Sequence, residues 1–243
     1  LEQEQSVEIF FCALNMIQKL MDCPDVAIYR VNKEKYARLF AYSSAKAASM
    51  GSTVYLPDKK PLDEACNENR VYINRSMEKE YPMMAYNVES EEQMEILIML
   101  WSIPFERMTI NEANRLIVIG KLIQTSVRRA DRYLEALSEE RYHSESQILK
   151  ASAFEELVGA YRKASKEKLT EYVLLQIEVE GKNEKETVDK CTLLLRESDY
   201  IGNLSDGKLY LLLTNTDLKG CSFVQNKLKQ NGVASSISEE GGL

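Results

Sequence analysis

The residues with the most specific chemistry in this chain are an arginine and an aspartate three positions apart, Arg196 and Asp199. A guanidinium is a planar fork of donors that matches the O6 and N7 acceptors of a guanine, and a carboxylate accepts hydrogen bonds from N1–H and N2–H of the same base. The spacing predicts that both side chains lie on one helical turn. The pair therefore predicts a site that reads guanine edges, and the alternative is a surface salt bridge between residues i and i+3.

The segment that follows this pair has a specific order. Five residues, 200–204, separate Asp199 from the turn sequence Ser-Asp-Gly-Lys-Leu at 205–209, and the apolar segment continues to residue 214. This order resembles the GGDEF domain of diguanylate cyclases, where an RxxD inhibitory-site motif precedes the GGDEF signature by the same gap. The resemblance implies that Arg196 and Asp199 bind cyclic di-GMP, often as an intercalated pair of molecules.

The catalytic half of that pattern is largely absent. Ser205 and Asp206 stand where cyclases have two glycines, and Gly207 and Lys208 stand where they have two acidic residues. An ammonium group repels the divalent metal that holds the triphosphate.

Two further features of a cyclase are missing. The metal-binding aspartate of the first strand would fall near Gln176 or Glu178, and only residues 181–183 are available for the loop that grips guanine. We therefore expect no catalytic residue, no metal site and no enzymatic activity. The alternative from the enzyme class is a weak diguanylate cyclase or a GTP-binding regulator.

The phosphates of cyclic di-GMP require more cations than Arg196. Lys227 and Lys229 lie near the position where the family often has an additional arginine, and a second basic cluster contains Arg128, Arg129 and Arg132. We expect Lys227, Lys229, Arg128 and Arg132 to contribute to the ligand site. For each of them the alternative is a solvated helix face.

Composition limits the classes of protein to which the chain can belong. Its 243 residues are 44% hydrophobic and 28% charged, which favours a folded protein of about two domains. The formal net charge of -7 argues against a broad surface for nucleic acid. The five cysteines are scattered, and with a single histidine they form neither a disulfide framework nor a zinc motif.

Periodicity predicts the elements that hold these residues. We expect an α+β fold with two domains, each with a central, mostly antiparallel or mixed sheet flanked by helices, joined by a long helix. In the first domain, helices are predicted at 6–21 and 61–69, and strands at 26–31, 35–44, 53–56, 71–75, 84–88 and 94–105. In the second domain, helices are predicted at 148–168, 183–198 and 218–230, strands at 171–180 and 233–238, and a hairpin at 200–214.

The connecting helix is predicted from Thr109 to about residue 146. A weak heptad of apolar residues runs along it at Leu116, Ile119, Ile123, Ala130, Tyr133 and Leu137. This seam predicts a homodimer formed through a coiled coil. The alternative is a helix that lies on its own domain and then projects from it.

The order of these parts carries a broader resemblance. Residues 1–108 resemble a GAF domain, 109–147 form the connecting helix, and 148–243 resemble a degenerate GGDEF domain. This layout is similar to that of the PelD family of cyclic di-GMP receptors. The resemblance implies a non-enzymatic receptor that regulates exopolysaccharide (Pel) synthesis and secretion in biofilms through a membrane synthase complex.

The resemblance also predicts a cellular context. The chain would be the cytoplasmic domain of an inner-membrane protein, and its start at Leu1 leads us to expect an anchor upstream. A dimerisation scaffold without a ligand remains the alternative to a receptor.

Overall fold

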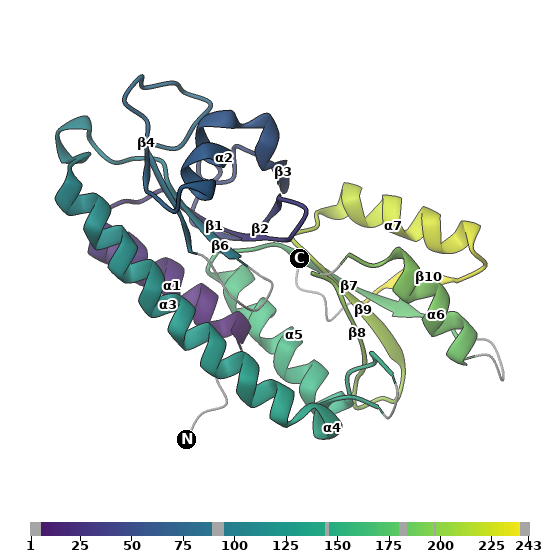
Figure 1. The fold of residues 1–243 in the computed structure, drawn as a ribbon. Helices are drawn as coiled ribbons and strands as arrows, with labels where there is room; N and C mark the ends of the chain where they lie inside the picture. The colour runs from purple at the N-terminus through teal and green to yellow at the C-terminus, as the bar shows by residue number, and fades with distance from the viewer. Residues whose placement is uncertain (1–5, 89–94, 144–145, 180–183, 197, 239–243) are drawn as a thin grey trace. The chain divides into compact units, whose positions relative to one another are not determined.

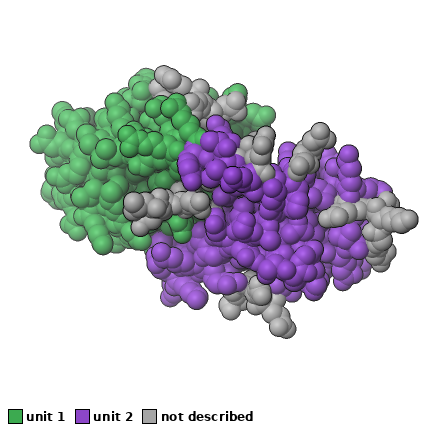
Figure 2. All heavy atoms as spheres, turned by 90° about the horizontal axis from the view of Figure 1, so that it is seen from below, with its two compact units in different colours: residues 1–132 green, residues 133–243 purple. Residues whose placement is uncertain are grey.

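The computed structural model describes residues 6–88, 95–143, 146–179, 184–196 and 198–238. The chain divides into two compact units, residues 1–132 and 133–243 (Figure 2). The boundary falls inside the long helix α3 (Ile110–Ala136), which lies within the predicted connecting segment 109–147.

Unit 1 is built on a six-stranded sheet with helices on both faces (Figure 1). The strand order is β3-β2-β1-β6-β5-β4, and the ladders between its described residues are antiparallel, which confirms the α+β class. Besides α3, its elements are α1 (Ser6–Met21), β1 (Val26–Val31), β2 (Tyr36–Tyr42), β3 (Thr53–Tyr55), the 3-10 helix η1 (Leu56–Asp58), α2 (Lys60–Asn67), β4 (Tyr72–Ile73), β5 (Met84–Val88), β6 (Glu95–Leu100) and the 3-10 helix η2 (Phe105–Arg107).

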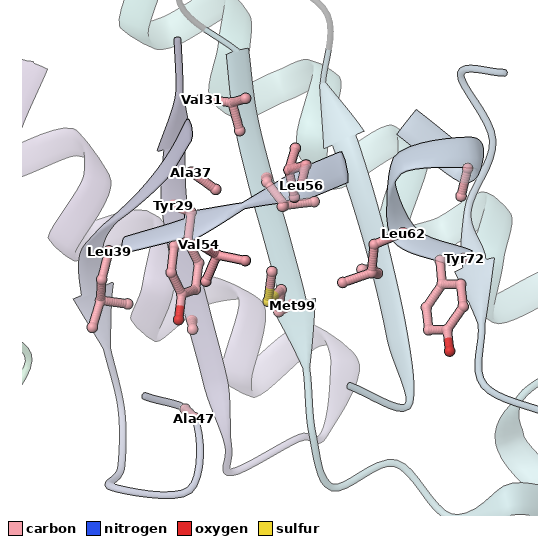
Figure 3. Packing of buried hydrophobic residues seen from close by; sticks show 14 of the residues in the cluster. Tyr29, Val31, Ala37, Leu39, Ala47, Val54, Leu56, Leu62, Tyr72 and Met99 are labelled. Carbon is pink, nitrogen blue, oxygen red and sulfur yellow. The ribbon is translucent and has the colours of Figure 1, made fainter. Parts of the chain in front are cut away.

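The two faces of this sheet bury different sets of side chains. On one face, Tyr29, Leu62 and Met99 belong to an apolar cluster that joins the sheet to α2 (Figure 3). On the other face lie α1 and α3 (Figure 1), where the mutually tilted rings of Phe10 of α1 and Phe40 of β2 have centroids 4.7 Å apart. Burial on both faces explains why β1 and β6 are almost continuously apolar.

The predicted coiled-coil seam is wrong for its first half. Leu116, Ile119 and Ile123 are at most 3% exposed because they pack into the core of unit 1. Gly120 makes this approach possible, since a Cβ at that position would lie 2.7 Å from Cγ2 of Val88. The packing agrees with the alternative of a helix that lies on its own domain.

The long helix is also shorter than predicted. It ends at Ala136, and a separate short helix, α4 (Ser138–Arg141), follows. The chain then turns back, because Tyr142 forms an isolated antiparallel bridge with Leu149 and the Lys150 N–H donates to the Arg141 carbonyl at 2.8 Å. Among the described residues, no helix is both long enough and apolar enough to cross a bilayer.

Unit 2 contains a four-stranded antiparallel sheet in the order β10-β7-β9-β8. Helices α6 and α7 cover one face through a cluster that includes Val188, Cys191 and Cys221. Helix α5 covers the other face, where Phe154 lies against Gly202 of β8. The elements are α5 (Ala151–Lys166), β7 (Tyr172–Ile177), α6 (Glu184–Leu194), β8 (Tyr200–Asn203), β9 (Leu209–Thr214), α7 (Leu218–Gln230) and β10 (Ser235–Ile237).

The contact between α5 and β8 gives a test of this packing. A Cβ at Gly202 would lie 2.4 Å from ring carbons of Phe154, so Gly202→Ala forces the helix and strand apart. We expect the free energy of unfolding to fall by about 1–3 kcal/mol in urea denaturation. Gly159→Ala in α5 is the matched control, because no atom beyond its chain neighbours and its own helix backbone lies within 4 Å of its Cβ position. That change should stabilise by about 0.5–1 kcal/mol, and equal effects of the two substitutions would contradict the packing.

Candidate functional site

The turn between α6 and β8 holds Arg196 and Asp199. Helix α6 ends at Leu194, so the prediction of one shared helical turn is wrong. The Asp199 carboxylate accepts a hydrogen bond from the Arg196 backbone N–H at 3.1 Å, and the Asp199 N–H donates to the Arg196 carbonyl at 3.0 Å. An aspartate that bonds to nearby backbone offers the chain an alternative to the helix, which explains its early end.

The same carboxylate ties this turn to the end of β9. Its Oδ1 accepts a hydrogen bond from the Thr214 backbone N–H at 3.1 Å, and Thr214 Oγ1 donates to the Ser198 carbonyl at 2.9 Å. Thr214 is buried, so these bonds are shielded on one side from water. Asp199 therefore has a structural function that its place in the motif does not predict.

The Arg196 side chain, by contrast, is exposed. Its guanidinium forms neither a hydrogen bond nor an ion pair with the part of the chain that the structure describes. The alternative of an i, i+3 salt bridge is not observed, because Asp199 contacts the backbone N–H of Arg196 rather than its guanidinium. The fork of donors is therefore available to a ligand.

Arg196 and Asp199 both line a hollow of about 600 Å³ within unit 2. This volume is in the usual range for small-molecule sites. Its walls come from residues 142, 146, 147 and 149, from the end of α6 and the turn that follows it, and from the start of β8. The polar and aromatic side chains among its lining residues are Tyr142, Ser146, Gln147, Thr192, Arg196, Asp199 and Tyr200.

Two tyrosines give this hollow aromatic surface. Tyr200 directly follows Asp199, whereas Tyr142 reaches the hollow because its segment pairs with Leu149, which bridges in turn to Gly202 of β8. Aromatic rings provide faces on which purine bases stack. Sequence reasoning missed both residues; adjacency to the motif could have indicated Tyr200, and no local signal indicates Tyr142.

The other cations predicted for the site are not among the residues that line the hollow. Lys227 and Lys229 are exposed on α7 and do not line the hollow, and the Lys227 ammonium lies 4.5 Å from the centroid of the Phe223 ring. Arg128 and Arg132 belong to unit 1, on α3. The contribution of these four residues stays a prediction.

The degenerate turn forms the predicted hairpin between β8 and β9. Gly207 has a φ of +76°, which favours glycine, and Asp206 accepts hydrogen bonds from the Lys208 N–H at 3.0 Å and the Tyr210 hydroxyl at 2.8 Å. The pKa of the Asp206 carboxyl lies below its usual value. The hydrogen bond from the Lys208 N–H lowers it most, and the hydrogen bond from the Tyr210 hydroxyl and the nearby Lys208 ammonium lower it further. The carboxylate is therefore charged at neutral pH and engaged in the turn.

Lys208 occupies the side of this turn that faces β7. Its ammonium lies 3.3 Å from Oε1 of Gln176 and 3.8 Å from Oδ2 of Asp206. A cation thus bridges the turn to one of the two positions where the resemblance puts a metal ligand. Across the described residues, no group of three or more His, Cys, Asp or Glu side chains could hold a metal ion. A separate hollow of about 320 Å³ lies beside the turn, against α5.

No protein-family model matches the chain. No curated protein sequence matches it either. Among solved structures, similarity is found to PelD from Pseudomonas aeruginosa PAO1, residues 158 to the C-terminus, with 13% identity, a TM-score of 0.39, and coverage of 98% of this chain and 85% of that one.

Two further structures are of PelD residues 156–455 from Pseudomonas aeruginosa PA14. The complex with c-di-GMP has 12% identity, a TM-score of 0.38, and coverage of 98% of this chain and 84% of that one. The apo form has 12% identity, a TM-score of 0.41, and coverage of 100% and 86%. Identities and TM-scores this low do not establish a shared function.

The different surroundings of Arg196 and Asp199 predict different effects on stability. Asp199→Ala leaves the Arg196 and Thr214 N–H groups without their acceptor, so we expect the free energy of unfolding to fall by about 1–3 kcal/mol. Arg196→Ala removes an exposed side chain and should change it by less than about 0.5 kcal/mol. Urea denaturation of both variants measures the difference. A larger loss for Arg196→Ala would show that its guanidinium has a structural partner.

Proposed function

We propose that this chain is a receptor for cyclic di-GMP that binds its ligand in the hollow at Arg196 and has no catalytic activity. The observation that carries the proposal is the exposed Arg196 guanidinium at the edge of this hollow. It forms no hydrogen bond or ion pair with the described residues. A bidentate contact from arginine to guanine O6 and N7 contributes about 1–3 kcal/mol of discrimination between bases. The spacing of the RxxD motif supports guanine as the base.

Two other parts of the site fit the same ligand. Tyr142 and Tyr200 offer aromatic faces for the guanine rings, and Asp199 holds the turn in place and is the proposed acceptor for N1–H and N2–H of a base. Lys227, Lys229, Arg128 and Arg132 are the proposed cations for the phosphates of one ligand molecule or an intercalated pair.

The absence of catalysis is proposed from the chemistry of the degenerate turn. Lys208 places an ammonium between Gln176 and Asp206, where a cyclase would need anionic ligands for divalent metal. Asp206, in turn, is held by hydrogen bonds from the Lys208 N–H and the Tyr210 hydroxyl. This turn therefore supports a folded hairpin and disfavours a metal-bound triphosphate.

The cellular role is proposed from the motif resemblance. Binding of cyclic di-GMP would regulate the synthesis and secretion of exopolysaccharide (Pel) through a membrane synthase complex. The chain would act as a dimer and as the cytoplasmic part of an inner-membrane protein.

Isothermal titration calorimetry with cyclic di-GMP tests the receptor directly. We expect the chain to bind, and Arg196→Ala to weaken binding at least about tenfold, because the fork of donors to guanine is lost. Lys219→Ala is the matched control, since it removes an exposed cation of unit 2 that does not line the hollow. Its affinity should equal that of the unmodified chain.

Undiminished affinity in Arg196→Ala would refute the proposed site. Incubation of the chain with GTP and Mg²⁺ tests the alternative of a weak diguanylate cyclase. Any cyclic di-GMP produced would contradict the proposal of a receptor without catalytic activity. Asp199→Ala is interpreted only together with its unfolding curve, since that carboxylate also holds the turn.

A further inference from the structure

Two arginines lie next to each other in unit 1, on the sheet face that carries α1. Arg30 of β1 is directly opposite Arg38 of β2 in the antiparallel register. Side chains in such positions have their Cβ atoms about 4.5–5.5 Å apart, and like charges there destabilise a sheet. Neither arginine forms an ion pair within the part of the chain that the structure describes.

These two guanidiniums are partly shielded from water. Both residues are half-buried, and Arg30 Nε and Arg38 Nη1 are buried nitrogens without a hydrogen-bond partner among the described residues. The Arg30 guanidinium carbon lies 5.8 Å from the ring centroids of both Phe10 and Phe40, which stabilises the cation but supplies no acceptor. Cationic N–H groups in this condition cost free energy unless an acceptor pairs with them, and an anion is the acceptor that also offsets their charge.

The neighbouring side chains on this face are also donors. The register pairs Tyr36 with Tyr55 and Arg38 with Thr53, while Val54 and Ala37 between them belong to the core cluster of the opposite face. The two tyrosine rings are 4.8 Å apart, and each residue is 40% exposed. Beyond the half-buried arginines, the face therefore continues as exposed aromatic rings with hydroxyl groups.

We propose that Arg30 and Arg38, with Tyr36 and Tyr55 beside them, form a second ligand site that binds a phosphate group. Two adjacent guanidinium forks match the charge and the several oxygens of a phosphate, and the tyrosine hydroxyls can donate further hydrogen bonds to it. The phosphate would come from a soluble phosphorylated molecule or from a lipid headgroup. The residues of this site belong to unit 1, whereas Arg196 belongs to unit 2.

Thermal unfolding of the full chain in inorganic phosphate, compared with KCl at equal ionic strength, tests this site. We expect phosphate to raise the Tm of the unmodified chain, because an anion that binds the folded state stabilises it. Arg38→Met keeps much of the apolar stem and removes one of two facing charges. In KCl, the Tm of this variant should therefore be higher than that of the unmodified chain. Its apparent affinity for phosphate should be at least about tenfold weaker.

Three variants make the result specific. Arg38→Lys keeps the charge without the fork and should lose most of the phosphate effect. Lys33→Met removes an exposed cation from the β1–β2 turn and should respond to phosphate as the unmodified chain does. Arg196→Ala should also retain the full response, which separates this site from the cyclic di-GMP site.

Two results would overturn the proposal: a phosphate effect no larger than that of KCl, or an equal phosphate effect in Arg38→Met. Sedimentation with phosphatidylglycerol vesicles, with phosphatidylcholine vesicles as the control, distinguishes the two sources of phosphate. Sedimentation that Arg38→Met abolishes supports a lipid headgroup. A phosphate effect without sedimentation supports a soluble ligand.

Discussion

The carboxylate of Asp199 is the constraint on which the candidate site depends. By accepting the backbone N–H groups of Arg196 and Thr214, it joins the end of α6 to the end of β9 and fixes the turn before β8. The Arg196 guanidinium forms no ion pair with Asp199, whose carboxylate contacts the Arg196 backbone N–H instead. The motif therefore forms a turn in which the Arg196 side chain lies at the edge of the hollow, rather than a surface salt bridge between Arg196 and Asp199.

Elements whose ends are determined by local signals were predicted well from the sequence. Helix α7 has the predicted bounds, because Asp217 caps its first turn by accepting the Gly220 N–H at 2.7 Å and Gly232, with a φ of +76°, follows its end. The early end of α6 could not be predicted in the same way, because one of the bonds that stabilise the turn comes from Thr214, fifteen residues away. Likewise, a heptad of apolar residues does not reveal whether its partner is a second chain or the sheet beneath Gly120.

The candidate site was predictable only in part. Residue types and spacing identified Arg196 and Asp199, and the structure brings both to one hollow. Tyr142 lies at that hollow because its backbone pairs with Leu149, and the residues of the motif do not predict this contact. The unpaired Arg30 and Arg38 were also missed, since alternation along β1 and β2 shows which face a residue occupies but not whether an acceptor lies opposite.

A crystal structure of the chain with cyclic di-GMP bound tests the central claim most directly. The account predicts a guanine in the hollow with its O6 and N7 within hydrogen-bond distance of the Arg196 guanidinium, while the Asp199 carboxylate still accepts the Thr214 N–H. A ligand bound away from Arg196, or a complex in which that guanidinium contacts no base, would contradict it.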